Sequence, residues 1–190
     1  MRFIIVDGID GSGKSTVAGW IAQHYSSLGE IVKLQTHPSD RFLGRLSRRC
    51  LRGQGRLMYM MSSALYIVDV LGSVVRLPLW QRRCDTVIFV RYLLATAYLP
   101  DRLAKFTYEM FVRVLPVPDR LLLIDVEPQN ALRRMSLRQD EEEMFENLSS
   151  LIEVRGRMLS LAHAWKVFDN NDGKGESLRR LEDILSGWDG

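Results

Sequence analysis

Short apolar runs bounded by turn-forming residues alternate along the chain with longer stretches in which apolar residues recur every three to four positions. The short runs are typical of buried strands, and the longer stretches of helices. Five strands are predicted, at residues 2–6, 31–35, 86–90, 120–126 and 166–168. Helices are predicted at residues 14–28, about 43–52, 55–77, about 102–115, 129–138, 142–162 and 176–186. Because strand and helix alternate throughout, the pattern predicts an α/β fold with a parallel sheet and helices on both faces.

Length and composition are consistent with one domain spanning residues 1–190. Hydrophobic residues make up 46% and charged residues 26% of the chain, which allows a sizeable core. Cys50 and Cys84 are too few and too far apart for a disulfide framework or a zinc site. The first apolar run has no charged segment before it, and no apolar stretch approaches the roughly 20 residues that span a bilayer. We therefore expect a cytoplasmic protein with no membrane partner.

The basic residues are mostly arginine. Of the 26 basic residues five are lysine, and the formal net charge is +3. Arginine suits planar phosphate contacts, so the bias favours a polyanionic ligand, although a GC-rich genome or a hot habitat produces the same bias. The arginines are scattered and lack the interleaved aromatic residues of a nucleic-acid surface. We therefore expect small-molecule nucleotides as ligands and no nucleic acid.

The segment that follows the first predicted strand matches the phosphate-loop pattern G-x-x-x-x-G-K-[ST] through Gly8, Gly13, Lys14 and Ser15. Glycines let the backbone turn its N–H groups toward a β-phosphate, and the helix that starts at Lys14 adds its N-terminal partial charge. Lys14 can bridge the β- and γ-phosphates, and the Ser15 hydroxyl can ligate Mg²⁺. The loop therefore predicts binding of a nucleoside triphosphate. Its expected nucleotide-binding residues are Gly8, Asp10, Gly11, Ser12, Gly13, Lys14, Ser15 and Thr16.

Other motifs narrow the class of phosphate-loop protein. A guanine-reading N-K-x-D is absent, since the "DNND" at residues 169–172 lacks the lysine. Motor-type ATPases usually carry a strand that ends in Asp-Glu, and the nearest match here is Asp125 and Glu127. The sequence therefore disfavours a GTPase. A motor ATPase is less favoured but stays open as an interpretation.

Four segments occur in an order that resembles the thymidylate kinases, a branch of the P-loop nucleoside monophosphate kinases. They are "VDGIDGSGKST" (6–16), "VRYLLATAY" (90–98), "PDRLLLIDVEPQNALRR" (118–134) and "RQDEEEMFE" (138–146). The resemblance implies a three-layer P-loop NTPase fold with a five-stranded parallel sheet and a short lid at about 134–142. It also implies transfer of phosphate from ATP to dTMP, Mg²⁺ on the donor phosphates, and a homodimer formed through the helices between the second and third strands.

The same resemblance assigns roles to four cationic residues. Arg134 and Arg138 match the family's lid arginines, and their i, i+4 spacing places them on one helix face. There they can act on the phosphoryl group in transfer, together with Lys14. Arg91 matches the arginine that holds the acceptor phosphate. The expected catalytic residues are Lys14, Arg91, Arg134 and Arg138.

The acceptor side departs from the family pattern. Val90 stands where the family carries a carboxylate that helps to organise Mg²⁺, and Tyr66 and Val70 stand where it carries a Phe…Arg pair that contacts thymine. Asp69 could replace the missing carboxylate, but an exposed helix acid is the default expectation, and Tyr98 is expected to be a core aromatic residue. The expected acceptor-binding residues are Asp10, Arg48, Tyr66, Arg91 and Tyr92.

These departures leave two further interpretations open. One is a kinase for another nucleotide or nucleoside, and the other is a nucleotide-binding regulatory protein with little turnover. Val90 separates them from a working thymidylate kinase, because a site in which no other carboxylate reaches Mg²⁺ favours slow turnover.

Overall fold

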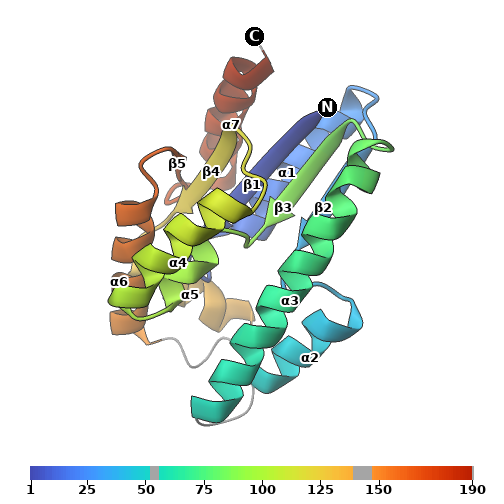
Figure 1. Cartoon of the computed structure of the whole chain (residues 1–190). Coiled ribbons are helices and arrows are strands. Elements are labelled where there is room, and N and C mark those ends of the chain that lie inside the picture. The colour runs from blue at the N-terminus through green and yellow to red at the C-terminus, as the bar shows by residue number, and fades with distance from the viewer. Residues whose placement is uncertain (52–55, 139–146, 190) are drawn as a thin grey trace.

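The computed structural model describes residues 1–51, 56–138 and 147–189 and has at its centre a five-stranded sheet (Figure 1). All strand pairs are parallel, and the strand order is β2-β3-β1-β4-β5. The strands are β1 (Arg2–Gly8), β2 (Val32–Thr36), β3 (Thr86–Val90), β4 (Arg120–Asp125) and β5 (Lys166–Asp169). The five predicted strands and the fold class are thereby confirmed.

The helices lie close to the predicted ranges. They are α1 (Lys14–Ser27), α2 (Phe42–Leu51), α3 (Arg56–Gln81), α4 (Asp101–Val114), α5 (Pro128–Arg138), α6 (Leu148–Leu161) and α7 (Lys174–Asp189), and a 3-10 helix η1 (Leu94–Tyr98) follows β3. Helix α3 was expected to end at Leu77, before Pro78, but it continues to Gln81 with the proline inside it. A proline removes one backbone hydrogen bond from a helix without always ending it. Residues 142–146 and the lid residues 139–142 lie outside the described part of the chain.

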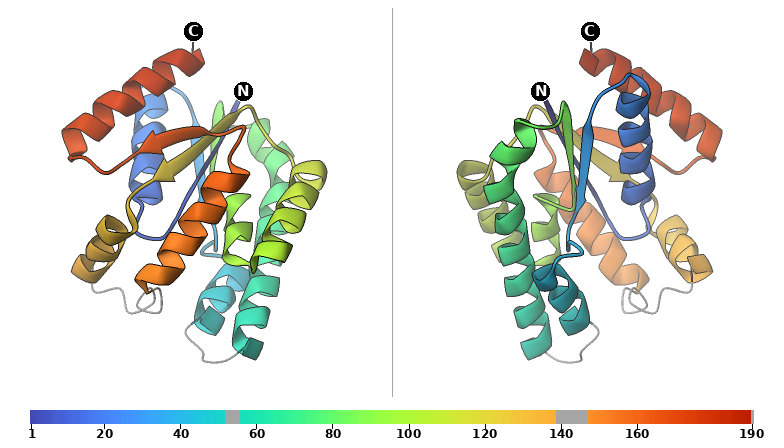
Figure 2. Two further views of the ribbon diagram at one scale, coloured as in Figure 1. Left: turned by 90° about the vertical axis from the view of Figure 1, so that its left-hand side faces the viewer. Right: turned by 90° about the vertical axis from the view of Figure 1, so that its right-hand side faces the viewer.

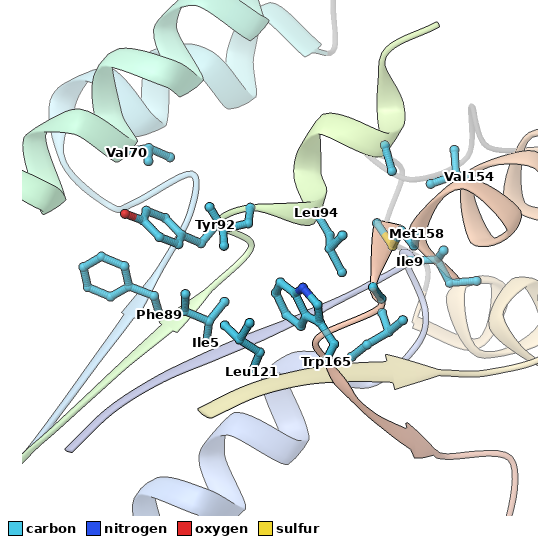
Figure 3. Close-up of a cluster of buried hydrophobic side chains, with 14 of the residues drawn as sticks. Ile5, Ile9, Val70, Phe89, Tyr92, Leu94, Leu121, Val154, Met158 and Trp165 are labelled. Carbon is cyan, nitrogen blue, oxygen red and sulfur yellow. The ribbon is translucent and has the colours of Figure 1, made fainter. Parts of the chain in front are cut away.

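Alternating residues of the strands pack on opposite faces of the sheet. Phe3 and Ile5 of β1 join a core cluster with side chains of α3 and α6, while Ile4 and Val6 join a second cluster with side chains of α1 and α7. Figure 2 shows α1 and α7 on one side of the sheet and α3, α4 and α6 on the other. The first cluster reaches from Val70 to Trp165 across the sheet (Figure 3). The fold therefore has three layers, and the carboxyl ends of all five strands meet at one edge.

Helix α3 contains two features that the sequence analysis did not predict. Asp69 was expected to be exposed, yet it is only 2% exposed. The segment Met61–Gln81 of α3 is also long and apolar enough, on length and composition alone, to cross a membrane. This contradicts the expectation that the chain contains no such stretch. The helix nonetheless buries Asp69 and Ser73 and packs on β3 and α2, as a helix that covers a sheet does.

Val90, at the end of β3, is fully buried in the cluster that includes Val6 and Ile88. We predict that Val90→Asp destabilises the protein by about 3 kcal/mol or more, because it buries a carboxylate among apolar side chains. Urea unfolding of the wild type and the variant measures this difference. Val90→Thr, which keeps the shape and adds no charge, serves as the control and should cost less. An aspartate variant as stable as the wild type and faster with dTMP would show that this position still accepts the family carboxylate.

Candidate functional site

A large pocket of about 950 Å³ lies at the carboxyl ends of β1, β2 and β3. Its walls come from the loop after β1, the loop after β2, one face of α3 and the loop after β3. Ligands of open parallel sheets bind at this edge, beyond the ends of the strands. The residues that line it include Asp10, Ser15, Arg41, Tyr66, Arg91 and Tyr98.

The glycine loop between β1 and α1 has the backbone that its sequence requires. Gly11 and Gly13 have φ angles of 74° and 89°, a left-handed conformation that other residues adopt at a cost. A Cβ on Gly11 would also lie 2.5 Å from the carbonyl oxygen of Ala131. Ser15 and Thr16 are exposed at the start of α1, where backbone N–H groups and hydroxyls can reach a phosphate.

Asn170, just after β5, supports this loop from behind and was not found by the sequence analysis. Its amide Nδ2 donates to the carbonyl of Ser12 at 2.8 Å, and its Oδ1 accepts from the hydroxyl of Ser177 at 2.9 Å. Arg134 Nη2 donates to the backbone carbonyl of Asn170 at 2.8 Å. One buried asparagine thus connects the phosphate loop with α7 and with α5.

The centre of the pocket is the buried carboxylate of Asp10. Lys14 Nζ donates to Asp10 Oδ1 at 2.9 Å, the guanidinium of Arg91 forms an ion pair with the same oxygen, and the Tyr98 hydroxyl donates to Oδ2 at 2.8 Å. Burial alone would raise the pKa of Asp10, but Arg91 and Lys14 hold it well below its usual range. Asp10 is therefore ionised and joins the phosphate loop to the loop after β3.

Tyr98 does more than the core packing that was expected of it. Its ring does pack against the core cluster, but its hydroxyl also accepts from the backbone N–H of Asp10 at 3.1 Å. The phenol thus accepts from the backbone of Asp10 and donates to its carboxylate, which fixes the carboxylate toward the two cations.

Arg91 itself is held in an uncommon backbone conformation, with a φ of 59°. Its N–H donates to the carbonyl of Val6 at 3.2 Å, and its carbonyl accepts from the hydroxyl of Tyr66 at 2.7 Å. The guanidinium lines the pocket. Tyr66 also lines the pocket, so its ring remains available to a ligand while its hydroxyl holds the loop.

Asp7, which follows the apolar residues of β1, holds the residues that follow Arg91. It accepts three consecutive backbone N–H groups, from Tyr92 at 2.9 Å, Leu93 at 3.0 Å and Leu94 at 2.9 Å. Burial raises the pKa of Asp7 to about 6, although these three donors oppose the shift. Its position directly after an apolar run is the sequence signal by which it could have been found.

The outer wall of the pocket is the loop after β2, which is clamped to α3. Ser39 donates to Asp69 through its N–H at 2.7 Å and through its hydroxyl at 2.5 Å, and Arg41 approaches the same carboxylate at 3.3 Å. Burial lowers the pKa of His37 to about 4, so the imidazole that contacts Ser73 is neutral at physiological pH. Asp69 is thus occupied in holding the wall and is not positioned as a substitute for the carboxylate missing at Val90.

The structure does not bring every predicted site residue to the pocket. Val70 and Tyr92 are buried in the core cluster, and the hydroxyl of Tyr92 donates to the carbonyl of Pro116 at 3.3 Å. Arg48 lies in α2 and Arg138 is the last residue of α5, but their side chains are outside the described part of the chain. Val70 faces the core because it follows the inward-facing Asp69 on the sheet side of α3.

The protein oxygens available to a metal ion are few. Within the described ranges 1–51, 56–138 and 147–189, no group of three or more His, Cys, Asp or Glu side chains could hold a metal. Asp125, the nearest match to the strand-end acid of a motor ATPase, is bound by Arg155 through two contacts of 2.7 Å. The exposed hydroxyl of Ser15 fits Mg²⁺, an ion that commonly takes most of its ligands from nucleotide phosphates and water.

A glycine loop closed onto a helix N-terminus, at the edge of a parallel sheet and beside a large pocket, defines a P-loop nucleotide-binding protein. The chain belongs to the thymidylate kinase family, a family of nucleoside monophosphate kinases, because the model of the thymidylate kinase family matches residues 6–180.

Curated relatives agree with this assignment. A thymidylate kinase of Leptospira interrogans is 29% identical over 161 residues, which cover 80% of this chain and 78% of the relative. A probable thymidylate kinase of Archaeoglobus fulgidus is 32% identical, and the match covers 80% of this chain and 78% of the relative. A probable thymidylate kinase of Pyrococcus abyssi is 31% identical, and that match covers 86% of this chain and 84% of the relative.

The support of the loop by Asn170 leads to a prediction. Asn170→Asp replaces the N–H donor that faces the carbonyl of Ser12 with an acceptor, so we expect ATP to bind about tenfold more weakly. Calorimetric titration with ATP measures the affinity.

Asn147→Asp is the matched control. Asn147 caps α6 by accepting from the Ser150 N–H, and an aspartate caps equally well while adding the same charge. Equal ATP affinities in both variants and the wild type would show that Asn170 does not shape the phosphate loop.

Proposed function

We propose that this protein transfers the γ-phosphoryl group of ATP to the 5′-phosphate of dTMP, which gives ADP and dTDP. The observation that carries the proposal is the meeting of Lys14 and Arg91 on the single carboxylate of Asp10. Lys14 belongs to the phosphate loop and Arg91 to the loop after β3, so the donor and acceptor sites adjoin within the reach of two side chains.

The donor half of the reaction follows from the phosphate loop. The residues of the loop, Gly8 to Thr16, bind the β- and γ-phosphates through backbone N–H groups, and Lys14 leaves Asp10 to contact them. Mg²⁺, when bound, neutralises the donor phosphates, and Ser15 is the residue of this chain that would hold it. Arg134 and Arg138 on α5 supply positive charge to the phosphoryl group in the transition state.

The acceptor half uses the large pocket. Arg91 binds the 5′-phosphate, Tyr66 packs on the base, and Asp10 lies near the sugar. An oxygen of the acceptor phosphate attacks the γ-phosphorus in line, and the bond from that phosphorus to the bridging oxygen of ADP breaks. Positioning and charge neutralisation drive this step, and no histidine is needed.

A kinase for a different nucleotide is the second candidate, and the placement of Val70 favours it. The family arginine that hydrogen-bonds thymine corresponds to a side chain that is buried in the core here, so this position cannot read a base. Other polar groups that line the pocket, such as Ser62 and Ser63, would then select the base.

A coupled assay of ADP release with a panel of nucleoside monophosphates and nucleosides tests the proposal. Turnover with dTMP well above the other acceptors supports it. If turnover is faster with another acceptor, that acceptor takes the place of dTMP as the proposed substrate. Tight ATP binding without turnover on any acceptor would favour a regulatory protein. Lys14→Ala in the same assay provides the background rate, because the loop then lacks its lysine.

We predict that Arg91→Ala and Arg134→Ala change different kinetic constants. Arg91→Ala should raise the KM for the acceptor by tenfold or more, roughly the 1.4 kcal/mol or more of a lost charge-assisted contact. Arg134→Ala should lower kcat more than it weakens ATP binding, because its charge acts mainly in the transition state. Equal and small effects from both substitutions would show that the acceptor and lid sites are misplaced.

We further propose that two copies of the chain associate through α3. Exposed apolar residues recur along one stripe of this helix at Val68, Leu71, Val75 and Leu79, a spacing that puts them on one face. An apolar stripe of this length is unfavourable in water and is covered when a second copy presents the same stripe across a twofold axis.

Val75 is 79% exposed, so an arginine there tests the dimer without disturbing the core. Val75→Arg should convert a dimer into a monomer in sedimentation equilibrium, while the melting temperature of the folded chain changes little. Leu28→Arg, at an exposed residue after α1, is the control and should leave the association unchanged. A wild type that sediments as a monomer at micromolar concentration would contradict the dimer.

A further inference from the structure

We propose that Tyr66 is a positioning residue whose hydroxyl holds Arg91 in place for the 5′-phosphate of the acceptor. The role rests on the proposed function, and it is distinct from the packing of the Tyr66 ring on a base. The acceptor class that it concerns is nucleoside 5′-monophosphates, whatever their base.

The backbone of Arg91 needs support because its φ of 59° is an unfavourable conformation for a residue with a Cβ. Such conformations persist where the surrounding structure fixes them. Two of the supports come from β1: the carbonyl of Val6 accepts the N–H of Arg91, and Asp7 accepts the three N–H groups that follow. Both supports act on N–H groups and leave the carbonyl of Arg91 to another partner.

Tyr66 is one such partner, and the buried imidazole of His37 also reaches the backbone of Arg91. The Tyr66 hydroxyl donates to the carbonyl of Arg91 at 2.7 Å, an ordinary distance for a well-formed O–H···O bond, across 25 residues of sequence and from a different wall of the pocket. Burial and the neighbouring carboxylate of Asp7 raise the pKa of Tyr66 well above its usual value. The phenol therefore stays protonated and remains a donor at every pH at which the protein would be assayed.

The position of Tyr66 also links Arg91 to α3. Since α3 and the loop after β3 both line the pocket, the bond joins two of its walls beside the guanidinium that would hold the phosphate of an acceptor. Where the resemblance places a phenylalanine, this chain has a residue that can stack and also donate. Loss of the hydroxyl alone leaves the ring and removes the hydrogen bond to the Arg91 carbonyl, while Asp7 still accepts the N–H of the same peptide. The peptide is then held less firmly, so the guanidinium spends less time beside Asp10.

The test compares Tyr66→Phe with the wild type by calorimetric titration of dTMP and of thymidine, which lacks the phosphate. We expect dTMP to bind about fivefold to tenfold more weakly to the variant, as for one lost hydrogen bond, and thymidine to bind equally well to both proteins. In steady-state assays the KM for dTMP should rise by a similar factor while the KM for ATP stays constant.

Tyr108→Phe is the matched control. The Tyr108 hydroxyl accepts from Trp165 Nε1 at 2.9 Å between α4 and β5, so this variant also loses one tertiary hydrogen bond of a phenol. Melting temperatures of the two variants separate a loss of stability from a loss of phosphate binding. Tyr108→Phe should bind dTMP and thymidine as the wild type does.

Three results would overturn the proposal. If Tyr66→Phe loses affinity equally for dTMP and thymidine, Tyr66 contacts the base and does not act on the phosphate. If the affinity for both ligands is unchanged, Tyr66 has no role in placing Arg91. If the assay with the panel of acceptors identifies another nucleotide as the preferred substrate, that nucleotide and its nucleoside become the probes. The predicted contrast would then support the role of Tyr66 although dTMP is not the substrate. A wild type that binds no nucleoside monophosphate would overturn both proposals.

Discussion

The carboxylate of Asp10 is the interaction on which the rest of the site depends. It is buried, and a buried carboxylate is tolerated only when cations and hydrogen bonds compensate for the lost water. Lys14, Arg91 and Tyr98 provide that compensation, and they come from helix α1, the loop after β3 and helix η1. One charge therefore fixes the relative positions of the phosphate loop and the loop after β3. In the proposed reaction the phosphates of both nucleotides would compete with Asp10 for the same two cations.

Around this centre, two pairs of polar residues support the two loops. Asn170 and Ser177 stabilise the phosphate loop from the side of β5 and α7, while Asp7 and Tyr66 stabilise the backbone around Arg91. Each support is a buried polar group with a defined partner, the kind of interaction that is costly to break on one side only. Because the supports belong to different elements, the site forms only when the whole sheet and its helices are assembled. The proposed chemistry needs such preorganisation, since in-line phosphoryl transfer relies on positioning and charge.

The five strands and the phosphate loop could be predicted because their signals are local in sequence: apolar runs, glycine spacing and the Lys-Ser that follows. The remaining features depend on partners that are distant in sequence. Asn170 contacts Ser12 across 158 residues, and the burial of Asp69 is explained by Ser39, 30 residues earlier, so neither segment reveals its role alone. Tyr98 was expected in the core, and its ring is there, but the direction of its hydroxyl follows from the fold. The buried Tyr92 shows likewise that a match to a motif position does not place a side chain in a pocket.

A crystal structure of the protein with ADP and dTMP tests the central claim most directly. The account predicts the β-phosphate of ADP inside the loop from Gly8 to Ser15, with Lys14 turned from Asp10 toward it. It also predicts the 5′-phosphate of dTMP within ion-pair distance of Arg91, on the side of the pocket that Tyr66 closes. A dTMP whose phosphate lies away from Arg91, or an ADP bound outside the glycine loop, would contradict the claim that the two sites meet at Asp10.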